Sequence, residues 1–173
     1  MDDALEYLLP ALIIGAGATT FTDLVAVART RLFGVPSPDY GLVGRWLANV
    51  ARGQVRQDPI ATTPRIRGEL LIGWSAHYLI GVAFAGLLLA IFGLRWSCHP
   101  TIGAALLVGI GSVVAPFMLM QPGMGGGIAA SRTPRPTQAR LRSLVTHAIF
   151  GVGLYVAALL ARSLEAFQCA ASH

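Results

Sequence analysis

The stretch LLIGWSAHYLIGVAFAGLLLAIF, residues 70–92, decides the fold class of this chain. It contains no Asp, Glu, Lys or Arg. A helix rises about 1.5 Å per residue, so about 20 apolar residues cross the roughly 30 Å hydrocarbon core of a bilayer. The stretch is therefore long enough to cross, and it predicts a membrane-spanning helix.

Three further apolar stretches lie at about residues 5–28, 101–120 and 144–161. Hydrophobic residues make up 54% of the 173-residue chain and charged residues only 12%, which is too apolar for an ordinary soluble domain. The first stretch follows acidic residues and no positive charge, so we expect a retained helix and not a signal peptide. The sequence predicts an all-α protein with one transmembrane domain, residues 1–173, built as an integral membrane four-helix bundle.

The arginines are distributed unevenly between these spans. All 13 positively charged residues are Arg, with seven in the connection 29–69, four in the connection 121–143, and one each in the second connection and the tail. Short loops rich in Arg are held on the cytoplasmic side. We expect a multi-pass protein of a bacterial inner membrane, with both termini on the periplasmic side. Since the arginines alternate with spans and do not cover one soluble face, we expect anionic lipid as a partner and no nucleic acid.

The first connection contains a predicted short helix. In PDYGLVGRWLANV, residues 38–50, Asp39 can cap a helix whose apolar residues recur at helical spacing. Such a helix suits the membrane interface, with Trp46 at the depth of the lipid headgroups. Two readings stay open. The helix packs on the bundle as a lid, or it binds lipid through Arg45 and Trp46.

Polar residues inside the spans form a second set of candidates. Asp23, His77 and His147 each lie on a helix face with small residues four positions away, and each is very roughly 8 to 12 Å from the predicted cytoplasmic edge. One carboxylate and two imidazoles could hold a proton, a cation or a transition metal. The reading that we favour is that these residues lock helix packing. A soft metal ion would bind the sulfur atoms of Met118, Met120 and Met124. Helix packing also accounts for methionines at this spacing.

The predicted orientation places both cysteines outside, where Cys98 and Cys169 could form a disulfide. They could equally stay unpaired, or join His99 and His173 in a metal site, although the spacing is not that of a zinc motif.

The stretch QPGMGGGIAASRTPRP, residues 121–136, interrupts the apolar pattern. Pro116 should kink the third span and Pro122 should end it, and the glycines that follow can turn in little space. Exposed backbone NH groups beside arginines predict an anion or lipid-phosphate site at Gly123, Gly125, Gly126, Arg132 and Arg135. A close-packed loop that seals the end of the bundle is the alternative.

Four segments together resemble a known family. They are RLFGVPSPDYGLVGRWL, GWSAHYLIGVAFA, APFMLMQPGMGGGIAASRTPRP and LRSLVTHAIFGVGLY. The chain is similar to a bacterial family of small multi-span membrane proteins known only as a domain of unknown function. The resemblance implies a four-helix integral membrane protein and transfers no catalytic residues.

Three classes of function follow. The leading one is a non-enzymatic accessory subunit or lipid-binding component of a larger membrane complex. The alternatives are a small transporter or channel protomer that uses Asp23, His77 and His147 and would have to form a homo-oligomer, and a metal-handling protein or membrane enzyme. No catalytic motif is present, so we expect neither enzymatic activity nor a cofactor.

Overall fold

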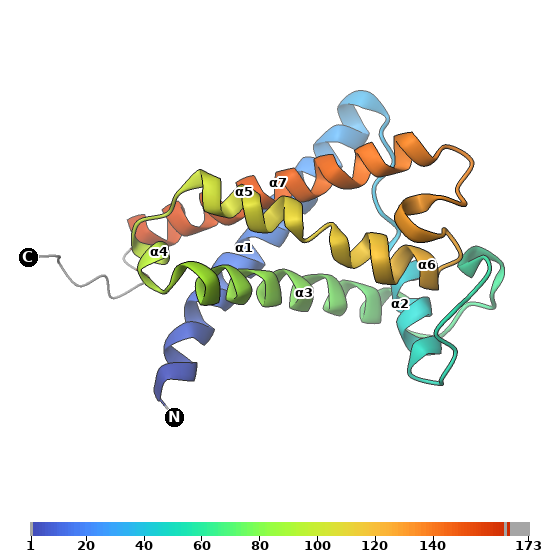
Figure 1. The fold of residues 1–173 in the computed structure, drawn as a ribbon, viewed down its shortest axis with the longest axis horizontal. Coiled ribbons are helices and arrows are strands. Elements are labelled where there is room, and N and C mark those ends of the chain that lie inside the picture. Colours follow the sequence, from blue (N-terminus) through green and yellow to red (C-terminus); the bar gives the residue numbers. More distant parts are fainter. Residues whose placement is uncertain (1, 165, 167–173) are drawn as a thin grey trace, which may run out of the picture. The chain divides into compact units, whose positions relative to one another are not determined.

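The computed structural model describes residues 2–164 and residue 166, and these residues form helices and no strands (Figure 1). Four segments are long and apolar enough to cross a membrane: Glu6–Phe33, Glu69–Phe92, Ile102–Gly123 and Pro136–Ser163. The predicted all-α class with four apolar spans is confirmed.

The helices follow one another with short connections, except after the first span. They are α1 (Asp2–Phe33), α2 (Tyr40–Val50), α3 (Glu69–Phe92), α4 (Arg95–Cys98), α5 (Ile102–Gly111), α6 (Gln121–Gly123) and α7 (Pro136–Ser163). Short helical turns at Ile60–Thr62, Pro116–Met120 and Ile128–Ala130 complete the set.

The described chain divides into two compact units, whose boundaries fall within α3 and α7. The first, which we call the apolar unit, comprises residues 1–35, 78–111 and 146–173. The second, the connection unit, comprises residues 36–77 and 112–145. Each unit is described by itself below.

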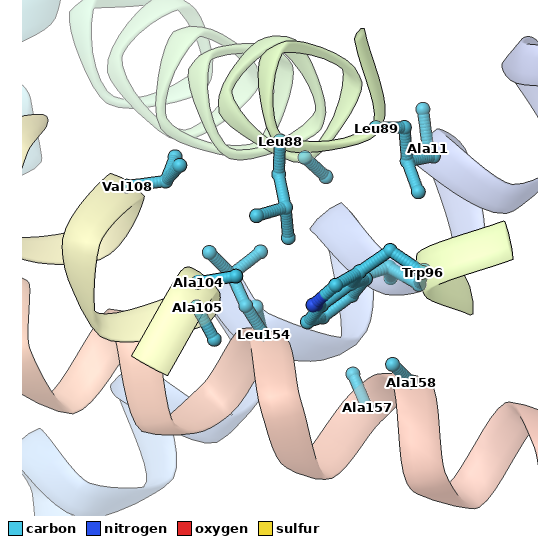
Figure 2. Packing of buried hydrophobic residues seen from close by; sticks show 13 residues of the cluster. Ala11, Leu88, Leu89, Trp96, Ala104, Ala105, Val108, Leu154, Ala157 and Ala158 are labelled. Atoms are coloured by element: carbon cyan, nitrogen blue, oxygen red, sulfur yellow. The ribbon is translucent and has the colours of Figure 1, made fainter. Parts of the chain in front are cut away.

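The core of the apolar unit consists mainly of leucines and alanines and is built from α1, α3, α4, α5 and α7. Figure 2 shows the side chains of Leu88, Trp96 and Leu154 entering one interior space from α3, α4 and α7. Leu88 and Leu154 are completely buried, and Trp96 is 5% exposed. The helix α4 was not predicted, and it places Trp96 in the core with its indole N–H donating to Thr101 Oγ1 at 3.2 Å.

Small residues mark the points where these helices cross. A Cβ added to Gly81 would overlap the Thr19 hydroxyl on α1, and one added to Gly109 would overlap the backbone of Gly151 on α7. Lipid tails are as apolar as leucine, so close van der Waals contact is what holds helices together in a membrane. The predicted small faces on the first, second and fourth spans are confirmed as packing faces.

The third span is interrupted where Pro116 was predicted to kink it, and it ends at Gly123, one residue after Pro122. Helix α5 stops at Gly111, a turn follows, and Pro116–Met120 has the wider π-helical pitch. Pro116 has no N–H and its ring crowds the preceding turn, which explains the widening. The chain then returns to α-helix, and Pro122 lies within α6.

The first and fourth helices also run beyond their predicted ends at residues 28 and 144. Helix α1 continues to Phe33, where Gly34 adopts a φ of +64° and its N–H donates to Thr30 O, a common helix stop. Helix α7 starts at Pro136, a residue whose fixed φ suits a first helical position. Hydropathy alone missed these turns because they carry Arg29, Arg31, Arg140 and Arg142.

We predict that Gly109→Leu destabilises the apolar unit. The added side chain meets backbone of α7, which cannot move as a side chain can, so overpacking should cost about 1–3 kcal/mol or more. Thermal unfolding in detergent measures the loss. Ala90→Leu is the matched control, because Ala90 is exposed on α3. Equal melting temperatures for the two variants would contradict the packing role of Gly109.

Candidate functional site

The connection unit is organised by a close approach between α2 and the first turns of α3. A Cβ on Gly44 would overlap the carbonyl oxygen of Glu69, and a Cβ on Gly73 would overlap that of Tyr40. Asp39 caps α2 as predicted, accepting from the N–H of Gly41 at 2.9 Å. The two glycines therefore allow the backbones of α2 and α3 to touch.

This approach brings Arg45 against Glu69. Arg45 Nε lies 2.8 Å from Glu69 Oε2, and Arg45 Nη2 lies 2.9 Å from Glu69 Oε1, a two-pronged ion pair. The Arg45 side chain is only 6% exposed and that of Glu69 16%. The hydrogen bonds that Arg45 donates to the Glu69 carboxylate raise the pKa of Arg45, so its guanidinium stays charged.

The remaining donors and acceptors of the pair hold the loop between the two helices. Arg45 Nη1 donates to Thr63 O at 3.0 Å, and Glu69 Oε2 accepts from the backbone N–H of Ile66 at 3.0 Å. A buried guanidinium with satisfied donors is stable, whereas one that loses its carboxylate is not. The pair therefore fixes the path of the first connection.

These contacts correct the predicted lipid-binding role of Arg45. Arg45 is buried in the pair just described and cannot reach a lipid headgroup. Trp46 donates its indole N–H to Val55 O at 2.9 Å, and its ring lies where a Cβ on Gly123 would be. The burial of Arg45 favours the packing reading of α2, whereas Trp46 is partly exposed and its contact with lipid stays a prediction.

We predict that Glu69→Gln loosens the first connection. The substitution keeps the shape of the side chain but leaves the guanidinium of Arg45 buried without its negative partner. We expect a lower melting temperature and faster tryptic cleavage at Arg52 and Arg56.

Asp58→Asn is the control for this prediction, because Asp58 pairs with Arg56 and Arg132 at the surface. Such exposed pairs contribute about 0–1 kcal/mol. If Asp58→Asn accelerates cleavage as much as Glu69→Gln, the buried pair is not what holds the loop.

The three predicted intramembrane polar residues each have local surroundings of their own. His77 Nε2 shares a 2.9 Å hydrogen bond with Tyr40 Oη, and the two rings stack with their centroids 4.2 Å apart. His147, in the apolar unit, is hydrogen-bonded to the backbone of Gly109 at the crossing of α5 and α7. Asp23 is half-buried on α1, one turn beyond Thr19. Both histidines thus contact neighbouring helices, which supports the packing role.

The described part of the chain does not provide a metal centre from His, Cys, Asp or Glu, because no group of three or more such side chains is arranged to hold an ion. Met118 is 51% exposed on the π-helical turn, where it faces outward and not into a cluster. Cys169 lies outside the described residues, so its disulfide with Cys98 stays a prediction.

The glycine loop after α6 closes on itself. The N–H groups of Met124, Gly125 and Gly126 donate to carbonyl oxygens of residues 120–122, and Arg132 N donates to Gly126 O at 2.8 Å. Gly125 and Gly127 have φ of +88° and +73°, which glycine adopts without strain. The anion cradle predicted at Gly123, Gly125 and Gly126 is thereby corrected, because these N–H donors are used inside the loop and Gly123 is covered by Trp46.

The same loop is joined to the first connection. Gln57 N donates to Gly123 O at 2.7 Å, and Ile60 N donates to Met124 O at 3.1 Å. Arg132, which is exposed, lies 3.6 Å from Asp58 Oδ2 across this junction. The loop is therefore the close-packed seal that was the alternative to an anion site.

A hollow of about 310 Å³ lies at the start of α7. Its lining residues come from the end of the glycine loop and the first turns of the helix: Thr133, Pro134, Arg135, Gln138, Ala139 and Arg142. Of the predicted anion-binding residues, Arg135 alone lines it.

Sequence reasoning missed Glu69 and Tyr40 as partners, and it placed Arg142 only among the four arginines around the predicted anion site. Glu69 carried a usable signal, since it is the acidic residue directly before an apolar span. Arg142 follows Arg135 by seven residues, a spacing that places both on one side of a helix.

Comparison with known proteins gives one match. The sequence model of a family described as "Protein of unknown function (DUF2938)" matches residues 12–161. No curated protein and no solved structure matches the chain significantly.

Proposed function

The chain belongs to the DUF2938 family of proteins of unknown function, and we propose that it is a non-enzymatic integral membrane protein that works as an accessory component of a larger membrane complex. The first support is the use of polar groups within the spans. Thr19 and Thr22 donate to the carbonyls of Gly15 and Ala18, each at 2.8 Å, and His147 bonds to the backbone of Gly109. The two threonine bonds lie within α1 and the His147 bond joins α7 to α5, so these contacts give the polar groups a structural use.

The second support is the large apolar surface that the spans leave uncovered. In the most apolar window of each span, 22–39% is buried within this chain. The remainder is free to meet lipid or the helices of another subunit. Because lipid and leucine are equally apolar, the residue types on this surface have to distinguish the two.

The observation that carries the proposal is an open glycine face on α5. Gly103 and Gly111 are eight residues apart on one face, with Leu107 between them 67% exposed. A Cβ at either glycine would have no heavy atom within 4 Å, unlike one at Gly109 on the same helix. Small residues on a lipid-exposed helix let a partner helix approach closely, and we assign this face to a partner subunit.

We predict that Gly103→Leu and Gly111→Leu abolish assembly with the partner while leaving the fold intact. Leucine fits the open space on this chain but keeps a second helix away. Native mass spectrometry of protein released gently from its own membrane measures the stoichiometry, and Ala90→Leu is the matched control on another exposed position.

The wild-type chain should appear in a complex of fixed stoichiometry with a different protein, and only the two glycine variants should lose it. A wild-type chain that is released as a monomer or a homo-oligomer would contradict the accessory role. Glycine variants that assemble normally would show that the α5 face is not the contact.

We further propose that the protein lies in a bacterial inner membrane with both termini on the periplasmic side. The arginine asymmetry between the connections supports this orientation. Arg45 is included in this arginine asymmetry although it is buried in the folded protein, because we take the orientation to be set during membrane insertion, before the ion pair with Glu69 forms.

Single cysteines placed in a Cys98→Ser/Cys169→Ser background test the orientation. We predict that a membrane-impermeant maleimide labels His99→Cys from outside, because His99 is an exposed residue of the second connection. It should label Ser131→Cys, in the exposed part of the third connection, only after permeabilisation. The reverse pattern would invert the topology.

A further inference from the structure

The four arginines of the third connection have two different kinds of surroundings. Arg132 lies 3.6 Å from Asp58, and Arg140 donates from Nε to Ala129 O at 2.7 Å. The guanidinium groups of Arg135 and Arg142 have no ion-pair or hydrogen-bond partner among the described residues. The two arginines without a protein partner are the two that line the hollow at the start of α7.

The lining residues stand on one side of the helix start. Arg135 directly precedes α7, and its carbonyl oxygen accepts from Ala139 N at 3.0 Å, while Gln138 and Arg142 lie four residues apart on one face of the first two turns. Thr133 and Pro134, from the end of the glycine loop, form the other wall. The loop is held by its own backbone hydrogen bonds, including Thr133 N to Ala130 O at 3.1 Å, so the wall is fixed before a ligand arrives.

The positive charges at the hollow are not balanced by acidic residues of the helix start. The first turn of α7 contains no acidic residue, and the free N–H groups of a helix start add positive partial charge beside the two guanidinium groups. An anion would relieve the repulsion between the arginines. Guanidinium forks match the oxygens of a phosphate, and the Gln138 amide offers an uncharged donor, whereas the Thr133 hydroxyl already donates to Ala130 O at 2.8 Å.

The surface next to the hollow is apolar. Leu141 is 61% exposed, Leu144 39% and Val145 37%, and all three follow directly along α7 where it enters its apolar span. A free phosphate would use the arginines and leave this surface unused. A phospholipid would use both, with its phosphate in the hollow and an acyl chain along the three apolar residues.

We propose that the hollow at Arg135 and Arg142 is a binding site for the phosphate of an anionic phospholipid. The site uses the end of the glycine loop as a wall but not the N–H groups of residues 124–126, which donate within the loop, and it does not depend on the accessory role of α5. An assembled complex would retain the site, and a chain that assembles with nothing would retain it too.

Lipid titration of the purified full chain by native mass spectrometry tests the site. The probes are long-chain phosphatidylglycerol, short-chain phosphatidylglycerol, long-chain phosphatidylcholine and inorganic phosphate. We expect one long-chain phosphatidylglycerol to bind per chain, and Arg135→Gln/Arg142→Gln to weaken that binding by about tenfold or more.

The matched control is Arg52→Gln/Arg67→Gln, which removes the same charge from two exposed arginines of the connection unit. We expect it to change the affinity by less than about twofold, because the charges are screened outside the hollow. Thermal unfolding of both double variants shows that they fold.

Equal losses in the two double variants would overturn the site, because binding would then follow net charge alone. Equal affinity for phosphatidylcholine and phosphatidylglycerol would overturn the anionic ligand. Inorganic phosphate or short-chain lipid binding as tightly as the long-chain lipid would overturn the role of the apolar residues and make a free anion the ligand.

Discussion

The ion pair between Arg45 and Glu69 holds the connection unit together, and it exists because Gly44 and Gly73 let α2 and α3 touch. From this pair the hydrogen bonds lead outward in sequence. Arg45 and Glu69 fix the loop at Thr63 and Ile66, and the preceding residues 57–60 bind the backbone of the glycine loop. These contacts order the long first connection although it has no large apolar core of its own.

The apolar unit follows the same rule by different means. In the connection unit, a charged pair holds two helices whose backbones touch. In the apolar unit, helices cross at glycines, and hydroxyls and an imidazole are hydrogen-bonded to backbone groups. Both solutions satisfy polar groups inside the protein, as a bilayer requires. His147, which looks functional in the sequence, contacts the backbone of a neighbouring helix, and the α5 face and the hollow at α7 are among the surfaces that remain open.

The arginines show how one residue type serves separate purposes in the same chain. Arg45 is structural and buried, Arg132 and Arg140 tie loops together, and Arg135 and Arg142 face a hollow with no partner in the described residues. Their shared effect on topology depends only on charge and on position along the chain. Their separate effects depend on what lies opposite each one, which is why an arginine count predicts orientation and does not identify a binding site.

The sequence by itself determined four spans, the cap of α2 and the small faces of the helices, because each depends on residues within a few turns of one another. The tertiary structure decided the partner of Arg45, which lies 24 residues away, and the covering of Gly123 by Trp46, which comes from a different connection. It also decided that the third span breaks before Pro116 and continues through Pro122. Hydropathy and residue spacing indicate whether a segment faces lipid, water or the protein interior. The features that the tertiary structure decided depend instead on which residue, distant in the sequence, a side chain contacts.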